Sequence, residues 1–209
     1  EIRRYVIEND LLDCIIQLPN DMFYNTGIAT YIWILSNKKP EIRKGKVQLI
    51  NANELYEKRR KSLGNKRNDI PKKYIDEITK LYGEFKESEI SKIFDNEDFG
   101  YSKIVVERPK LKEDGTPELK KGKPVADTSL RDTENVPLKE DINEYFEREV
   151  LPFAPDAWID EKKTKIGYEI PFTRYFYKYV PPKASKDIEM EIREIEMDLN
   201  GILEEIFND

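Results

Sequence analysis

The sequence of 209 residues contains no histidine and only one cysteine, Cys14. Zinc sites and cysteine–histidine nucleophile systems are built from these two residue types, so the composition argues against both. A lone cysteine also excludes an internal disulfide and suits a reducing compartment. We therefore expect a cytoplasmic protein without a bound metal.

Glycines are few, and no two of the 9 stand within two positions of each other. This spacing excludes a Gly-x-Gly loop for a dinucleotide-like cofactor, and it excludes a P-loop. The sequence also lacks an apolar run of about 18 residues and an N-terminal signal pattern, so we expect no membrane partner. Carboxylate-pair hydrolysis stays open, because 42 acidic residues offer many accidental pairs.

Charge is abundant and unevenly distributed along the chain. The net charge is −6, which by itself argues against binding to DNA. However, residues 38–73 hold 13 Lys or Arg against 4 Asp or Glu, whereas residues 184–209 hold 2 against 9. The first segment therefore has a net charge of +9 and the second of −7, which indicates different partners for the two segments.

Three apolar runs of strand length follow a helix-like opening at residues 1–9. The runs cover residues 11–18, 28–35 and 46–51, and the second is apolar almost throughout. Continuous apolar runs are typical of strands covered on both faces of an α/β sheet. We expect an α/β fold with the terminal strands and helices of a doubly wound sheet, then a mixed α+β region and a C-terminal coiled-coil-like helix.

The middle of the chain alternates between helical, strand-like and loop-like patterns. Asn53 is a possible N-cap for a helix over residues 53–61, and residues 62–69 resemble a loop. The remaining expectations are a helix over 71–87, a strand over 101–106, a flexible loop or β-hairpin tip over 109–124, a helix over 138–150, and strand-like or irregular structure over 158–179.

The last helix, which follows Pro181-Pro182, carries an apolar stripe. Its members are spaced alternately by four and three residues, as in the a and d positions of a coiled coil. An isolated helix of this length is marginal in water, so the stripe must pack on something. Docking on the chain's own body and binding to a partner both stay open. The stripe consists of Ile188, Ile192, Ile195, Leu199, Ile202 and Ile206.

Several motifs in one order resemble a known family. Residues 10–37 read DLLDCIIQLPNDMFYNTGIATYIWILSN, with Leu-Pro after a strand, then Phe, Thr-Gly and a strand that ends in Trp-Ile-Leu. Further matches are GYSKIVVERP at 100–109 and PDAWIDEKKTKIGYEIPFTRYFYKYVPP at 155–182. Together these segments resemble the modification subunits of type I restriction–modification systems, and the resemblance covers most of the chain.

This resemblance implies a site-specific DNA adenine methyltransferase, which transfers a methyl group from S-adenosylmethionine to adenine N6. It implies DNA as substrate, and as partners a specificity subunit, a second modification subunit and a restriction subunit. The sequence lacks the family's cofactor loop and its Asn-Pro-Pro-Phe loop, which we expect before Glu1. We therefore expect a fragment that binds no cofactor itself, has no complete catalytic site and is inactive alone.

Methylation of adenine N6 requires a flipped base that is held by stacking and edge contacts. By position in the family, the loop over residues 19–27 supplies an aromatic ring to that base. We predict contact through Phe23, with Tyr24 second and Asn25 beside them. The alternative interpretation is that Phe23 is a core residue that anchors the loop, and that the polar residues only form turns.

Backbone contact with DNA requires dense positive charge, because neutralising phosphates releases counterions. The sequence offers one cluster with few carboxylates between its members. The alternative is a solvated or disordered surface loop, as charge runs often are. The predicted DNA-backbone residues are Lys58, Arg59, Arg60, Lys61, Lys66 and Arg67.

Three regions follow from these patterns. We expect the C-terminal part of a methyltransferase domain at residues 1–55, a mixed region at 56–182 and a partner-binding helix at 183–209. The resemblance implies that the helix binds the specificity subunit. The alternative function, of a different class, is a non-catalytic module that binds DNA and protein. A nuclease or NTPase has no supporting motif.

Overall fold

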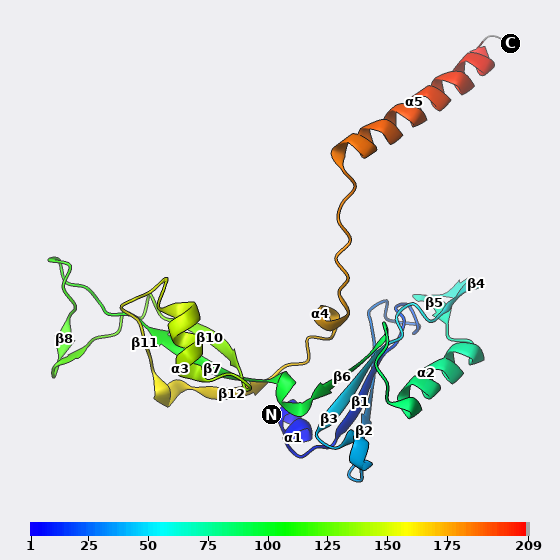
Figure 1. The fold of residues 1–209 in the computed structure, drawn as a ribbon. Coiled ribbons are helices and arrows are strands. Elements are labelled where there is room, and N and C mark those ends of the chain that lie inside the picture. The colour runs from blue at the N-terminus through cyan, green and yellow to red at the C-terminus, as the bar shows by residue number, and fades with distance from the viewer. Residues whose placement is uncertain (208–209) are drawn as a thin grey trace. The chain divides into compact units, whose positions relative to one another are not determined.

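The structure is a computed structural model that describes the backbone of residues 1–207 and the side chains of residues 1–203. It comprises two compact units, residues 1–176 and 177–209. The expected division at residues 55 and 182 stays a prediction. The first unit begins with α1 (Ile2–Glu8), β1 (Leu12–Gln17), β2 (Tyr31–Leu35), β3 (Lys46–Asn51), β4 (Glu57–Leu63), β5 (Lys66–Asp69), α2 (Lys72–Glu84) and β6 (Ser91–Asp95) (Figure 1).

The first sheet has the strand order β2-β1-β3-β6. The strand β1 is parallel to β3, whereas β1–β2 and β3–β6 are antiparallel pairs. The strands expected at 11–18 and 46–51 are confirmed, as is the opening helix. The result is a mixed α/β fold with several sheets, in which one parallel pair lies at the centre of the main sheet.

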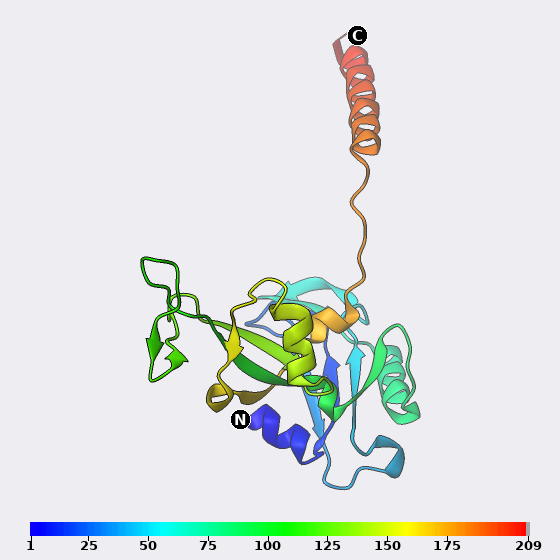
Figure 2. The ribbon, with the colours of Figure 1, turned by 60° about the vertical axis from the view of Figure 1, so that its left-hand side comes forward.

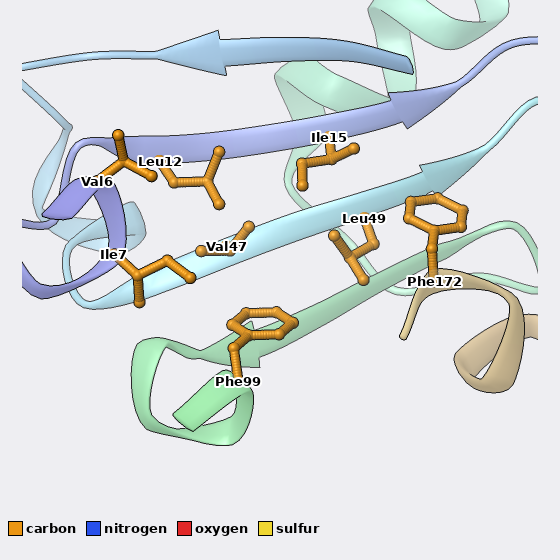
Figure 3. Packing of buried hydrophobic residues seen from close by; sticks show 8 residues of the cluster. All are labelled: Val6, Ile7, Leu12, Ile15, Val47, Leu49, Phe99 and Phe172. Carbon is orange, nitrogen blue, oxygen red and sulfur yellow. The ribbon is translucent and has the colours of Figure 1, made fainter. Parts of the chain in front are cut away.

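Both faces of this sheet bury apolar side chains. The register shifts between Leu12 and Cys14, so Leu12 and Ile15 point to the same face although they are three residues apart. Cys14 points to the other face, where α2 covers the sheet, and burial raises the pKa of its thiol to about 12. Figure 3 shows the first cluster: Val6, Ile7, Leu12, Ile15, Val47, Leu49, Phe99 and Phe172.

A buried arginine ties the sheet to α2. Arg43, in a short 3-10 turn before β3, donates to Asp13 at 2.7 Å, to the Tyr82 carbonyl at 2.9 Å and to Gln48 at 3.0 Å. Its guanidinium lies 4.4 Å and 4.1 Å from the ring centres of Tyr82 and Phe85. Burial, followed by its hydrogen bond to Asp13, raises the pKa of the Tyr82 hydroxyl to about 12.

The expectation that residues 28–35 form a strand covered on both faces is wrong. The strand begins only at Tyr31, and most of its side chains are exposed. Trp33 keeps 41% of its surface exposed to solvent. The physical reason is position, because β2 lies at the end of the strand order and pairs only with β1. Composition alone does not distinguish a central strand from an edge strand.

The helix expected at 53–61 and the loop expected at 62–69 are also wrong. These residues form an antiparallel hairpin of β4 and β5, with Leu63 opposite Lys66. Gly64 makes the turn with a φ of +58°, which glycine adopts without strain. No apolar stripe of helical period runs through the segment, so nothing would bury a helix there. We call residues 57–69 the basic hairpin.

The second sheet has the order β10-β7-β11, with β12 also paired to β7. The strand expected at 101–106 and the helix expected within 138–150 are confirmed, and residues 109–124 contain a β-hairpin (Figure 2). The elements are η2 (Asn96–Phe99), β7 (Gly100–Glu107), β8 (Leu119–Lys120), β9 (Lys123–Pro124), β10 (Asp132–Pro137), α3 (Ile142–Tyr145), η3 (Phe146–Val150), β11 (Trp158–Ile159), β12 (Lys165–Tyr168) and α4 (Phe172–Phe176).

The second unit contains one long helix, α5 (Ser185–Phe207), which follows the Pro-Pro pair as expected. Five stripe residues with described side chains are exposed, whereas the sixth, Ile206, lies outside the described side chains. Within residues 1–207, no helix combines the length and apolarity that crossing a membrane requires. The exposed five are Ile188, Ile192, Ile195, Leu199 and Ile202.

We predict that Arg43→Met lowers the free energy of unfolding by about 3–5 kcal/mol, because it leaves the buried Asp13 carboxylate without its cation. Urea unfolding followed by circular dichroism measures the change. Lys44→Met is the matched control, since Lys44 pairs with Glu41 on the surface and should change stability by less than about 1 kcal/mol. Equal effects of the two substitutions would contradict the role assigned to Arg43.

Candidate nucleic-acid interface

The parallel strands β1 and β3 end at the same edge of the sheet, and the predicted DNA elements follow them there. The 19–27 loop leaves β1 just after Gln17, and the basic hairpin follows β3. The Ala52 amide donates to the Gln17 carbonyl at 3.0 Å and so joins the two strand ends. In open α/β sheets, ligands bind outside the carboxyl ends of the strands.

Backbone hydrogen bonds join the 19–27 loop to the basic hairpin. The carbonyl of Asp21 accepts from the amides of Arg67 at 2.9 Å and Asn68 at 3.2 Å. The buried Asn68 side chain donates to the Asn20 carbonyl at 2.9 Å. Asp21 adopts a φ of +56°, a left-handed conformation in which aspartate is enriched. The two segments are therefore one hydrogen-bonded surface.

The tip of the basic hairpin also contacts the loop. The amide of Asn65 donates to the Tyr24 carbonyl at 3.0 Å. A Cβ at Gly64 would lie 2.9 Å from that carbonyl oxygen and 3.1 Å from the Tyr24 ring. Only glycine fits here without displacing the loop, because its positive φ and the close approach both exclude a side chain.

The apex of the 19–27 loop presents its polar and aromatic side chains to solvent. Phe23 keeps 47% of its surface exposed, so the interpretation of Phe23 as a core residue is wrong. Tyr24 and Asn25 are also exposed. Phe23 forms an isolated bridge with Thr26, which holds the apex in a tight turn. Contact between these residues and a base stays a prediction.

The six predicted cations all lie on the basic hairpin, but they differ in their surroundings. Lys66 and Arg59 pair with Asp69 at 2.9 Å and 2.5 Å. The hydrogen bond from Lys66, followed by that from Arg59, holds the pKa of the Asp69 carboxyl below its usual range. Lys66 also donates to the Met22 carbonyl at 3.2 Å. These two cations therefore stabilise the hairpin and its contact with the loop.

The other four cations are exposed, and none forms an ion pair with another described residue. These four cations are Lys58, Arg60, Lys61 and Arg67. Lys58 and Arg67 line a hollow of about 570 Å³ between the loop and the hairpin. The hollow is lined by Asp21, Tyr56, Lys58, Arg59, Ser62, Arg67 and Asn68.

Sequence reasoning found the cations and the loop apex but missed the residues that join them. Asn68, Gly64 and the carbonyl of Asp21 act through contacts with residues 40 or more positions away in the sequence. The only local signal was Gly64-Asn65, a dipeptide typical of turns. Among the described residues, no group of three potential ligands could hold a metal ion.

Residues 1–120, which include both the loop and the basic hairpin, match the family described as N-6 DNA Methylase. The chain belongs to the N-6 DNA methylase family. The methylase subunit of the type I restriction enzyme MjaIX from Methanocaldococcus jannaschii is 35% identical over 89 residues, which are 43% of this chain and 15% of that protein. The HindI methylase subunit from Haemophilus influenzae is 42% identical over 55 residues, 26% of this chain and 12% of that protein.

A solved structure of a type I restriction–modification methyltransferase subunit from Streptococcus thermophilus is also similar. It has 25% identity and a TM-score of 0.40, over 47% of this chain and 19% of that one. The family model and the methylase-subunit relatives confirm the resemblance to type I modification subunits. The chain spans less than a fifth of the length of each of these relatives.

We predict that Gly64→Ala destabilises the protein by about 1 kcal/mol or more, because alanine is strained at this positive φ and its Cβ meets Tyr24. Urea unfolding measures the change. Gly83→Ala is the control: Gly83 lies in α2 with open space around it, so alanine should stabilise the helix by up to about 1 kcal/mol. A Gly64→Ala protein as stable as the wild type would refute the close approach.

Proposed function

We propose that this chain is part of a type I restriction–modification methyltransferase subunit that methylates adenine N6 in DNA, and that it supplies the target-base loop, a DNA-backbone surface and a subunit-binding helix. The observation that carries the proposal is the hydrogen-bonded surface of the 19–27 loop and the basic hairpin, which lies within the family-matched segment. Exposed aromatic rings beside unpaired cations suit a strand with one unstacked base.

In this proposal the flipped adenine stacks against the exposed ring of Phe23, with Tyr24 as the second candidate. Asn25, at the same apex, offers an amide that can both donate and accept at the edge of a base. The position of the loop at the carboxyl end of β1 supports this assignment. Tyr24 has a further task, because its carbonyl and ring hold the hairpin tip.

S-adenosylmethionine is the methyl donor that the family implies for the whole protein. The residues of this chain do not fit that cofactor. The ends of β1 and β3 continue into Leu18-Pro19 and Ala52-Asn53, so neither end carries the glycines that let a backbone approach a nucleotide closely. We therefore assign no cofactor contact and no step of methyl transfer to these residues, and we expect the isolated chain to be inactive.

We also propose that the main sheet continues beyond β2 in the whole protein as a doubly wound sheet. Exposed, apolar edge strands are rare on isolated proteins because they invite pairing. Hollows of about 490 and 690 Å³ flank the strand and expose more apolar surface. Tyr31 and Trp33 line the first hollow, and Ile32 and Ile34 line the second.

The exposed stripe of α5 supports its assignment as the helix that binds the specificity subunit. Burying one Ile or Leu side chain fully contributes about 1.5–3 kcal/mol, and five such residues are exposed. The acidic character of residues 184–209 suits a basic partner face rather than DNA. A second modification subunit and a restriction subunit complete the proposed complex.

The second candidate function is a non-catalytic module that binds both DNA and a helical partner. The absence of a cofactor-type glycine loop from this sequence favours it. The discriminating observation is the remaining sequence of the whole protein. A glycine-rich cofactor loop and an Asn-Pro-Pro-Phe motif there support the methyltransferase, whereas a protein without them would be a binding module.

The DNA-backbone assignment predicts salt-dependent binding. We expect the chain to bind a mixed-sequence duplex in fluorescence anisotropy, with log affinity falling linearly against log salt. Replacing Lys58, Arg60, Lys61 and Arg67 together by Gln should flatten the slope by about 0.9 for each phosphate that the variant no longer neutralises. Lys80→Gln, on the exposed surface of α2, is the control. An unchanged slope in the fourfold variant would exclude the hairpin as the DNA surface.

The helix assignment predicts that Ile195→Asp with Leu199→Asp abolishes association with the specificity subunit on gel filtration. Met190→Asp with Met197→Asp is the matched control, since both methionines are exposed and lie about 180° around the helix from the stripe. Circular dichroism should show both proteins folded. If the stripe variant still forms the complex, the coiled-coil assignment is wrong.

A further inference from the structure

The four unpaired cations of the basic hairpin are not equivalent. Lys58 and Arg67 line the hollow between the hairpin and the 19–27 loop, whereas Arg60 and Lys61 do not. All four are exposed. On a surface that attracts DNA only by its overall charge, all four cations would contribute equally. The hollow instead divides them into two that line it and two that do not.

We propose that this hollow is a discrete subsite for one backbone phosphate of the DNA strand whose base contacts the 19–27 loop. The inference rests on the proposed function and deepens it. It assigns direct phosphate contact to Lys58 and Arg67, with the hydroxyls of Tyr56 and Ser62 as further donors. Arg60 and Lys61 contribute only long-range attraction.

The main chain is held in place at both cations. The Arg67 amide is bonded to the Asp21 carbonyl at 2.9 Å, and Lys58 is paired across the hairpin with the buried Asn68. Because the main chain is already anchored, only side-chain conformational entropy is lost when a phosphate binds. A guanidinium and an ammonium beside two hydroxyls form a donor set that matches a phosphodiester, which has only acceptor oxygens.

Two other charged groups line the hollow. Arg59 is already paired with Asp69 at 2.5 Å, so it adds little free charge. Asp21 is the one acidic residue, and its Oδ1 lies only 2.8 Å from where a Cβ of Gly27 would be. Its carbonyl, not its carboxylate, bonds the hairpin, so the carboxylate can be neutralised without removing those bonds.

The Asp21 carboxylate makes the ligand's charge testable. A phosphate in the hollow is repelled by it, whereas a cationic group or a base edge rich in N–H donors is attracted. Asp21→Asn is nearly isosteric, and asparagine also tolerates the left-handed backbone at this position. The subsite therefore predicts that Asp21→Asn binds DNA more tightly than the wild type.

The experiment compares single variants of the full 209-residue chain on one mixed-sequence duplex, by fluorescence anisotropy across a salt series. Lys58→Gln and Arg67→Gln should each lower affinity about tenfold and flatten the salt slope by about 0.9, as the removal of a charge-assisted bond to a phosphate does. Arg60→Gln and Lys61→Gln remove the same charge outside the hollow and should each lower affinity less than about threefold. Lys80→Gln on α2 is again the control. Urea unfolding checks that every variant is folded.

Each outcome decides a different claim. Equal losses for all four variants, or weaker binding by Asp21→Asn, overturn the phosphate subsite while the DNA-binding surface stands. A wild-type chain that binds no duplex at low salt overturns the proposed function and the subsite together. Selective loss at Lys58 and Arg67, with a gain at Asp21→Asn, supports both.

Discussion

The parallel pairing of β1 with β3 is the constraint on which the interface depends. Parallel strands deliver their carboxyl ends to the same edge of a sheet, so the segments that follow them must emerge side by side. Here those segments are a loop with exposed aromatic rings and a hairpin dense in cations. The sheet thus places the exposed aromatic rings and the cations at the same edge.

Electrostatics on this surface divides the cations by task. Asp69 neutralises Arg59 and Lys66, and the resulting pairs hold the hairpin in shape against the 19–27 loop. The cations without such partners keep their charge available for an anion. Surface ion pairs of this kind contribute little stability individually. The backbone hydrogen bonds to the Asp21 carbonyl therefore do most to hold the hairpin against the loop. The second unit, by contrast, is acidic.

An element can be predicted from the sequence when the residues that stabilise it lie close together in the chain. The apolar runs of β1 and β3 specify strands by themselves, and the stripe on α5 specifies a helix. The hairpin escaped prediction because its stability comes from bonds to residues more than 40 positions away, such as Asn68 to Asn20. The exposure of β2 escaped for a similar reason, since the order of strands in a sheet is a long-range property.

The candidate residues were found by charge and family resemblance, but their grouping was not. No pattern in the sequence indicates that Lys58 and Arg67 line one hollow while Arg60 does not, because alternation is lost where the register shifts between Lys58 and Leu63. Equally, composition cannot separate a buried Phe23 from an exposed one. Both distinctions require the fold, and both determine which side chains can reach a ligand.

If the 19–27 loop and the basic hairpin act as one DNA-binding surface, duplex DNA must cover both segments at once. Hydrogen exchange followed by mass spectrometry, with and without duplex DNA, measures this coverage. We expect amides in residues 19–27 and 57–69 to be protected together on binding, while those of β7 and β10 are unchanged. Protection of the hairpin alone, or only of segments outside both, would contradict it.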